Sequence, residues 1–162
     1  MNLIVSVDKD WAIGCGNQLL FHVPEDMSYF RKMTVGKVVV MGLMTFFSLP
    51  ESKPLKDRVN IVLSDKDLDI RGAVVCRSIG EVLEETAKYP PDDVFVIGGQ
   101  SVYEQLLPYC TRAYVTAFCA HKRADRYFPD LSRDPAWRLV SRSGIRRHEG
   151  TDYTFDIYER VS

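Results

Sequence analysis

Hydrophobic and polar positions divide the chain into short apolar runs separated by longer polar or mixed segments. Residues 2–7 are apolar and rich in β-branched side chains, without the alternation that a half-exposed strand would show. Similar apolar runs occur at 38–41, 59–63, 73–76, 94–97 and 113–118. Runs of this kind predict strands that are buried on both faces, as they are in a parallel sheet.

Four segments between these runs carry the signals of helices. The first begins at Pro24-Glu25-Asp26 and extends to about Met33, because proline suits the first helical position and acids suit the first turn. Another covers 78–88, where Ser78 and Glu81 have the spacing of a capping box. Two shorter helices are predicted at 43–48 and 101–107.

A loop and a hairpin complete the pattern. Residues 8–23 contain Gly14 and Gly16 and predict a long loop, a feature that is often functional in compact domains. From 137 to 160, apolar and polar residues alternate around a turn near Glu149-Gly150. This alternation predicts an antiparallel hairpin at the end of the chain.

Short strands that alternate with helices predict an α/β fold in one domain covering residues 1–162. We expect a mostly parallel, twisted sheet of about eight strands, with an antiparallel C-terminal edge and about four flanking helices. Ligands of such sheets bind beyond the carboxyl ends of the strands. Those ends lie at Ser6–Asp8, Gly42, Ser64–Asp65, Gly98-Gly99 and Thr116.

Composition and charge argue against several classes of protein. Hydrophobic residues make up 46% of the chain and charged residues 27%, the balance of a globular protein. The net charge of −1 gives no sign of a nucleic-acid binder, and the basic group from Arg142 to His148 fits a solvated strand and turn. No signal sequence or membrane-length apolar stretch is evident, so we expect a cytoplasmic protein. The four cysteines and three histidines lack the spacing of a metal site, so we expect free thiols and no metal.

Asp26 is the first candidate for chemistry. Its place at a helix start puts it on one face with the apolar Phe30 and Met33. A carboxylate on an apolar face is costly unless a partner compensates it. The pattern allows either an acid that faces solvent at the helix N-terminus or a buried acid that meets a cationic or amidine-like ligand. Burial would raise the pKa of Asp26 and the helix N-terminus would lower it, and the sequence leaves open which effect dominates.

Two strand ends carry glycines directly before a helix start. Gly98-Gly99 follows the strand at 94–97, and Gly42 precedes Leu43-Met44-Thr45 in the same way. Glycines permit close approach of a ligand and helix starts offer N–H groups to phosphate, so two such sites at one edge suit a dinucleotide. Each alone equally fits a tight turn, and the sequence has neither the Rossmann G-x-G-x-x-G nor a P-loop motif. Arg58, just before a strand, fits either a solvated side chain or a fork for a carboxylate.

Together these motifs resemble those of the dihydrofolate reductases, nearly from end to end. No single piece is specific, whereas their order and spacing are. The matching pieces are Ile13-Gly14, Val23-Pro24-Glu25-Asp26-Met27 with Phe30, Met41-Gly42 with Thr45, Pro54-Leu55 with Arg58 and Asn60, Ile97-Gly98-Gly99 with Val102-Tyr103-Glu104-Gln105, Thr116, and Phe128-Pro129.

The resemblance implies hydride transfer from a nicotinamide dinucleotide to 7,8-dihydrofolate, which gives tetrahydrofolate for one-carbon metabolism. It implies NADPH as the cofactor, with NADH use possible, a monomer, and inhibition by antifolates. Asp26, assisted by Thr116, would bind the pterin and promote protonation of N5, and Leu19 and Phe21 would complete the catalytic set. Arg58 would hold the α-carboxylate of the glutamate tail. The substrate-binding residues would be Ile4, Val5, Asp26, Met27, Phe30, Leu49, Lys53, Arg58, Ile97, Tyr103 and Thr116.

The resemblance also implies a dinucleotide site, in which residues of about 38–90 form an adenosine-binding subdomain. A mobile loop with Ile13, Gly14 and Leu19 would close over the nicotinamide, and the Gly98-Gly99 peptide is typically cis. The cofactor-binding residues would be Ser6, Ile13, Gly14, Leu19, Gly42, Leu43, Met44, Thr45, Leu63, Ser64, Asp65, Arg77, Ile97, Gly98, Gly99, Gln100, Ser101, Val102 and Tyr103.

Several positions depart from the family pattern. Leu20-Phe21 replaces the usual Pro-Trp, which removes an indole donor near the substrate. Leu43 stands where an arginine usually meets cofactor phosphate, Asp65 lies near the expected 2′-phosphate, and Ser101 replaces a common basic residue. Because an acid at such a site favours a free ribose hydroxyl, we expect NADPH to be used with a weakened preference over NADH.

Two other functions fit parts of the pattern. One is a related pterin or riboflavin-pathway reductase on the same fold, and the other is a non-catalytic nucleotide- or folate-binding module. Asp26, Phe30 and Arg58 together favour a folate substrate over the first alternative. An acid beside a cofactor cradle favours an enzyme over the second.

Overall fold

The computed structural model describes residues 1–161, and its main elements follow the order expected from the sequence. The strands are β1 (Asn2–Val7), β2 (Ala12–Cys15), β3 (Gln18–Leu19), β4 (Val38–Gly42), β5 (Val59–Leu63), β6 (Ala73–Cys76), β7 (Val94–Gly98), β8 (Arg112–Phe118), β9 (Arg126–Tyr127), β10 (Trp137–Arg142), β11 (Arg146–His148) and β12 (Thr151–Arg160). The helices are α1 (Pro24–Thr34), α2 (Leu43–Ser48), α3 (Ile79–Thr86) and α4 (Gln100–Leu106). Short 3-10 turns are η1 (Pro50–Ser52), η2 (Pro91–Asp93), η3 (Leu107–Tyr109) and η4 (Leu131–Arg133).

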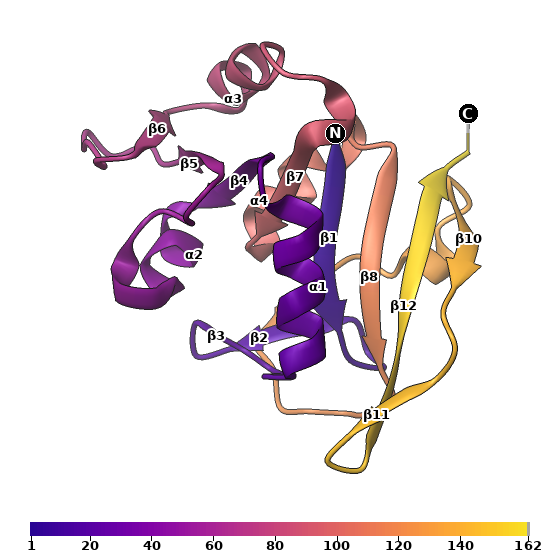
Figure 1. Cartoon of the computed structure of the whole chain (residues 1–162). Helices are drawn as coiled ribbons and strands as arrows, with labels where there is room; N and C mark the ends of the chain where they lie inside the picture. Colours follow the sequence, from indigo (N-terminus) through magenta and orange to yellow (C-terminus); the bar gives the residue numbers. More distant parts are fainter. Residues whose placement is uncertain (162) are drawn as a thin grey trace.

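The large sheet has the strand order β10-β12-β8-β1-β7-β4-β5-β6, which can be followed from right to left in Figure 1. Strands β8 to β6 in this order run parallel to one another, whereas β12 is antiparallel to both β8 and β10. The short β11 pairs with β12 and brings the sheet to nine strands. The expected parallel sheet with an antiparallel C-terminal edge is therefore confirmed.

The central strands are buried on both faces, as their apolar runs predicted. Val38, Val39, Val40 and Met41 of β4 are each at most 2% exposed. Val38 and Val40 belong to the larger apolar cluster, whereas Val39 and Met41 belong to a second cluster with Phe46 of α2. Because neighbouring residues of a strand point to opposite faces, apolar layers cover both sides of the sheet.

The segment 8–23 differs from the expected loop, because it contains the short strands β2 and β3. They form a hairpin around Gly16-Asn17, and β2 also pairs with β9. Both turn residues have positive φ, at 59° and 61°, which matches the twist of a tight hairpin turn. The strands are too short to show alternation, so the sequence pattern did not reveal them.

Smaller differences concern element ends. Helix α4 begins at Gln100 rather than 101, and α3 ends at Thr86 rather than 88. The Ser78 hydroxyl caps α3 as expected by accepting from the Glu81 N–H, but the Glu81 carboxylate accepts from the Arg77 N–H instead of closing the box on Ser78. The predicted C-terminal turn at Glu149-Gly150 is confirmed, with β11 and β12 on either side.

Several arginines of the C-terminal strands form ion pairs. The basic residues of β10 and β11 face acids, and Arg142 pairs with Asp156 and Arg147 with Asp152. The four cysteines are free thiols. Within residues 1–161, no helix is both long and apolar enough to span a membrane, and no cluster of potential ligands could hold a metal ion.

Candidate active site

The strand ends meet at one edge of the sheet, where the site was expected. Strands β1 and β8 are parallel, and their register places Ser6 opposite Thr116. Strand β7 pairs with both β1 and β4, and the register of β4 with β5 places Gly42 opposite Leu63. The carboxyl ends of these strands therefore bring Ser6, Thr116, Gly42 and Leu63 to the same edge of the sheet.

Asp26 lies in the first turn of α1, the helix in front of β1 in Figure 1. The Ser6 hydroxyl donates to Oδ2 of Asp26 at 2.5 Å, and the Thr116 hydroxyl donates to Oδ1 at 2.7 Å. Among residues 1–161, no cationic side chain forms an ion pair with this carboxylate. Asp26 thus matches the second sequence interpretation, an acid withdrawn from solvent.

The pKa of Asp26 is raised above its ordinary value, chiefly because burial disfavours the charged form. The hydrogen bonds from Ser6 and Thr116 lower this pKa, and the nearby charge of Glu25 raises it further. Burial therefore dominates, which answers the question that the sequence left open. A carboxylate in this state gains most from a ligand that brings positive charge or N–H donors.

Glu25, the neighbour of Asp26, points to different partners. Its carboxylate accepts a hydrogen bond from the Tyr153 hydroxyl at 2.7 Å and pairs with Arg146 at 3.0 Å. These bonds join the start of α1 to β11 and β12. They leave Asp26 as the acid of this turn that faces the strand ends.

The predicted apolar contact residues differ in exposure. Ile4 and Val5 of β1 are buried in the sheet, with exposed fractions of 6% and 8%. In contrast, Leu19, Met27 and Met44 are each at least 60% exposed, although they are large and apolar. Three such side chains on β3, α1 and α2 offer contact area that a bound molecule could cover. Partly buried Phe30, Leu49 and Ile97 complete the predicted apolar set.

The glycines at the strand ends leave space that other residues would fill. Gly98 has a φ of 125°, and a Cβ atom built there would lie 3.3 Å from the ring of Tyr103. A Cβ on Gly42 would lie 3.0 Å from Val102, and one on Gly99 would lie 3.4 Å from the Thr45 hydroxyl. The Gly98-Gly99 peptide is cis, as the resemblance implied. This close approach of backbone and helix starts suits a cradle for phosphate groups.

Tyr103 supports this cradle from inside the protein. Its ring is 4% exposed, and its hydroxyl donates to the carbonyl of Ile4 at 2.7 Å. Burial raises the pKa of Tyr103 far above its ordinary value, so the hydroxyl remains a neutral donor. Tyr103 therefore joins α4 to β1, and its predicted contacts with substrate and cofactor stay a prediction.

The expected adenosine end shows mixed charge. A cavity of about 200 Å³ there is lined by Lys66, Asp67, Leu68, Asp69, Ile70, Ala73, Val75 and Arg77. The Ser64 hydroxyl accepts from the Lys66 N–H, and Arg77 lies 3.7 Å from Asp67. Asp65 is exposed beside them. Leu43 and Ser101 bring no positive charge to the starts of α2 and α4.

Arg58 is fixed near the C-terminal end of α1. Its guanidinium donates to the Thr34 hydroxyl at 3.1 Å and to the Lys56 carbonyl at 2.9 Å. Burial lowers the pKa of Arg58, and the neighbouring Arg31 lowers it further, yet a guanidinium stays charged at neutral pH. Its remaining N–H donors fit the predicted role of binding a carboxylate. Lys53, another predicted substrate residue, is exposed and pairs with Glu51 at 3.4 Å.

The β2–β3 hairpin is tied to the segment that contains β9. The Gly16 N–H donates to the Asp125 carboxylate at 3.1 Å, and the Asp125 N–H donates to the Gly14 carbonyl at 3.0 Å. These bonds join the hairpin, which contains Ile13 and Leu19, to the segment that leads into β9. Asp125 was missed by sequence reasoning because its partners lie about a hundred positions away.

Phe21, which stands where the family usually has tryptophan, lies in an aromatic stack. Its ring stacks on Phe118 with centroids 3.9 Å apart, and the Lys122 ammonium lies 4.7 Å from its centre. Lys122 also donates to the Leu20 carbonyl at 3.0 Å. The departure at Leu20-Phe21 is thus accommodated by apolar and cation–π contacts.

The structure gives Ser6 a contact that the sequence did not predict. Its hydroxyl donates to Asp26, and its expected contact with the cofactor stays a prediction. The strand register pairs it with Thr116, so both hydroxyls reach the same carboxylate. The sequence does place a hydroxyl residue near the end of each of these two strands. It does not show that the two strands are neighbours in the sheet, which is what brings both hydroxyls to Asp26.

Comparison with known proteins gives a consistent result. A family model described as dihydrofolate reductase matches residues 1–160. A dihydrofolate reductase of Bacillus subtilis is 36% identical, covering 99% of this chain and 94% of the relative, and one of Neisseria meningitidis is 34% identical with coverage of 99% and 98%. Among solved structures, a dihydrofolate reductase from Enterococcus faecalis complexed with NADP(H) and RAB-propyl has a TM-score of 0.87 at 29% identity, covering 99% of this chain and 96% of that one.

Proposed function

This chain belongs to the dihydrofolate reductase family, and we propose on that basis that it reduces 7,8-dihydrofolate to tetrahydrofolate with NADPH. The observation that carries the proposal is Asp26, a partly buried carboxylate held by two neutral hydroxyls at the carboxyl edge of the sheet. Such an acid fits the amidine-like edge of a pterin. The glycine cradle beside it fits the phosphates of a dinucleotide.

The fit to a dinucleotide rests on the glycines. Gly42, Gly98 and Gly99 each leave a space that a Cβ would reduce, beside helix starts that have no side-chain cap. When bound, NADPH supplies the hydride that the reduction needs. The chain's own residues supply the binding surface, with residues of about 38–90 contacting the adenosine.

The proposal includes a role for each of the main substrate residues. The reduction adds a hydride and a proton across the N5=C6 bond of dihydrofolate, so the protein must bind the pterin and allow a proton to reach N5. We propose that Asp26 and Thr116 bind the amino group and ring nitrogen of the pterin, and that Asp26 favours the enol-type tautomer and the protonation of N5 by water. Arg58 binds the α-carboxylate of the glutamate tail.

The cellular setting is part of the same proposal. We propose a cytoplasmic monomer that supplies one-carbon metabolism and is inhibited by antifolates. The family relationship supports this setting. The net charge of −1 argues against a nucleic-acid partner.

The test is the absorbance at 340 nm with purified protein, NADPH and dihydrofolate. We expect oxidation of NADPH only when dihydrofolate is present, and a loss in kcat/KM of about 100- to 10,000-fold for Asp26→Asn near neutral pH. Asp130→Asn is the matched control, because Asp130 also accepts from a serine hydroxyl but caps the exposed turn η4 and makes none of the predicted site contacts. No oxidation by wild type, or an unchanged Asp26→Asn variant, would overturn the proposal.

We propose in addition that the preference for NADPH over NADH is weakened. The support is the charge at the adenosine end, where Asp65 and Asp67 accompany Lys66 and Arg77, and where Leu43 is neutral. We expect kcat/KM to favour NADPH by less than about a hundredfold, or about 2.7 kcal/mol. Asp65→Asn should increase the preference about tenfold, and a larger wild-type preference or an unaffected variant would contradict this idea.

A further inference from the structure

Each carboxylate oxygen of Asp26 accepts a hydrogen bond from one hydroxyl, and the two donors come from neighbouring strands. Ser6 and Thr116 are register partners on β1 and β8, so their hydroxyls lie at the same level of the sheet. Ser6 reaches Oδ2 at 2.5 Å and Thr116 reaches Oδ1 at 2.7 Å. One donor alone would leave the carboxylate free to rotate, whereas two donors on separate strands define its plane.

We propose that Ser6 is a positioning residue for Asp26, and this inference rests on the proposed function. Its hydroxyl fixes the plane of the carboxylate and favours the ionised form. An ionised carboxylate has about four acceptor sites, of which the two hydroxyls use two. The remaining site on each oxygen is then aimed at a pair of N–H donors, the pattern that a pterin's amino group and ring nitrogen present.

The groups around Asp26 show why a second hydroxyl matters. Glu25 on α1 adds a negative charge that raises the pKa of Asp26. Tyr29 on α1 and Tyr153 on β12 also face it, and burial raises the pKa of each to about 12, so both are neutral near pH 7. Strands β1 and β8 contribute Ser6 and Thr116. The two hydroxyls are therefore the groups that offset burial of the charge.

The sign of the effect follows from this arrangement. A hydrogen bond donated to a carboxylate stabilises the charged form and lowers the pKa of the acid. Removing the Ser6 hydroxyl should therefore raise the pKa of Asp26, by about one pH unit. The ionised form would then be available only at higher pH, and the carboxylate would also lose its fixed plane.

The experiment is a carbon-13 NMR titration of the Asp26 carboxyl in the full-length protein, beside the pH profile of kcat/KM. We expect Ser6→Ala to move the midpoint upward by about one pH unit and to shift the acidic limb of the profile equally. Ser6→Thr should restore the wild-type midpoint, because it keeps the hydroxyl. Ser6→Cys keeps the volume of the side chain but offers only a weak donor, so its midpoint should resemble that of Ser6→Ala. It takes the place of Ser6→Ala if that variant does not fold.

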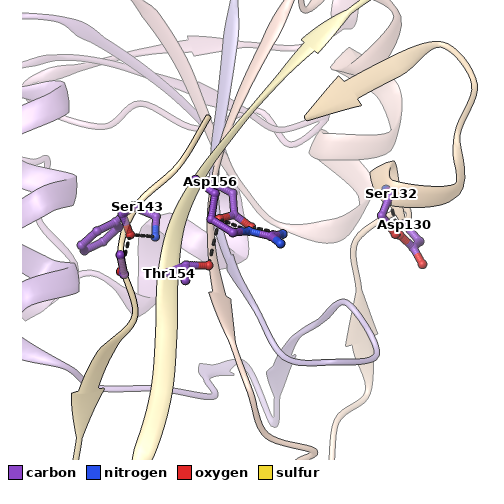
Figure 2. Close-up of polar contacts among 8 residues, drawn as sticks. Asp130, Ser132, Ser143, Thr154 and Asp156 are labelled. Atoms are coloured by element: carbon purple, nitrogen blue, oxygen red, sulfur yellow. Dashed lines mark hydrogen bonds and ion pairs between the residues drawn. The ribbon is translucent and has the colours of Figure 1, made fainter. Parts of the chain in front are cut away.

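Ser132→Ala is the matched control. Ser132 donates to the Asp130 carboxylate at 2.5 Å, the same length as the Ser6 bond, but this pair is exposed (Figure 2). Its removal should leave the Asp26 midpoint unchanged. A midpoint in Ser6→Ala or Ser6→Cys equal to that of wild type would overturn the role of Ser6.

The two proposals fail in different ways. If wild type does not oxidise NADPH with dihydrofolate, the proposed function fails whatever the NMR titration shows. If wild type is active but the Ser6 variants keep both the wild-type midpoint and profile, only the positioning role of Ser6 fails.

Discussion

Two acids withdrawn from solvent, Asp156 in β12 and Asp26 in α1, are compensated in opposite ways. Asp156 is 1% exposed and accepts two hydrogen bonds from the Arg142 guanidinium, both at 3.0 Å. The Thr154 hydroxyl adds a third bond at 2.8 Å, shown in Figure 2. Asp26 also accepts from hydroxyls, but no cation among residues 1–161 pairs with it.

The difference separates a structural acid from a functional one. At Asp156 the negative charge is matched within the β10–β12 pair, because Arg142 lies directly opposite in the register. At Asp26 two neutral hydroxyls offset the charge only in part, so the free protein bears a cost that a ligand can relieve. The contrast can be measured, because removing each charge should change stability in opposite directions.

The largest expected effect on stability is at Asp156. Asp156→Asn removes the charge that faces Arg142 inside the β10–β12 pair, and we expect unfolding free energy to fall by about 2–3 kcal/mol. The estimate lies below that for a fully buried pair, because Arg142 is half exposed and water can solvate it. Urea unfolding at pH 7 gives the value.

The control for Asp156 is Asp152→Asn. Asp152 pairs with Arg147 at 2.6 Å, but that pair lies at the surface and should contribute little. Activity should remain within about twofold of wild type in both variants, since neither acid lies at the site. Equal stability losses in both variants would show that burial does not distinguish the two pairs.

Asp26→Asn should have a smaller effect of opposite sign. Because burial raises the pKa of Asp26, the charged form is disfavoured in the folded protein. Replacing it with a neutral amide should increase unfolding free energy at pH 7, by less than Asp156→Asn lowers it, while activity is lost. Thermal unfolding checks this, and a variant that is both inactive and less stable would contradict the contrast with Asp156.

The smallest expected effect is the pH dependence of the stability difference between Asp26→Asn and wild type. The pKa of Asp26 is raised in the folded protein, so its contribution to stability is fully present below the unfolded value and is lost as pH rises through the folded value. The stability gap between Asp26→Asn and wild type should therefore be widest near neutral pH and close on acidification. Urea unfolding at several pH values measures the gap. A gap that widens at low pH would contradict a raised pKa of Asp26 in the folded protein.

Much of the fold could be predicted because its strands carry strong local signals. The run at 38–41 is apolar throughout, and β4 is buried on both faces. Pro24 marks the start of α1 and Glu149-Gly150 marks the last turn. In contrast, β2 and β3 are stabilised by a tight turn and by pairing with the distant β9, which no local pattern shows.

The candidate site was predictable in position but less so in contacts. The strand ends indicated Thr116 and the glycines, because parallel strands bring their carboxyl ends to one edge, and the start of the first helix indicated Asp26. The bond from Ser6 to Asp26 depends on strand order and register, as does the one from Gly16 to Asp125. Such contacts arise from tertiary structure, and one sequence does not encode them in any short motif.

The central claim is that the Asp26 carboxylate, which pairs with no cation among residues 1–161, is kept for a ligand with paired N–H donors. Calorimetric titration with a 2,4-diaminopyrimidine tests it most directly, with wild type, Asp26→Asn and Asp156→Asn compared at pH 7. We expect Asp26→Asn to weaken binding at least about a hundredfold, or about 2.7 kcal/mol, and Asp156→Asn to stay within about threefold of wild type. Binding to Asp26→Asn as tight as to wild type would contradict the claim.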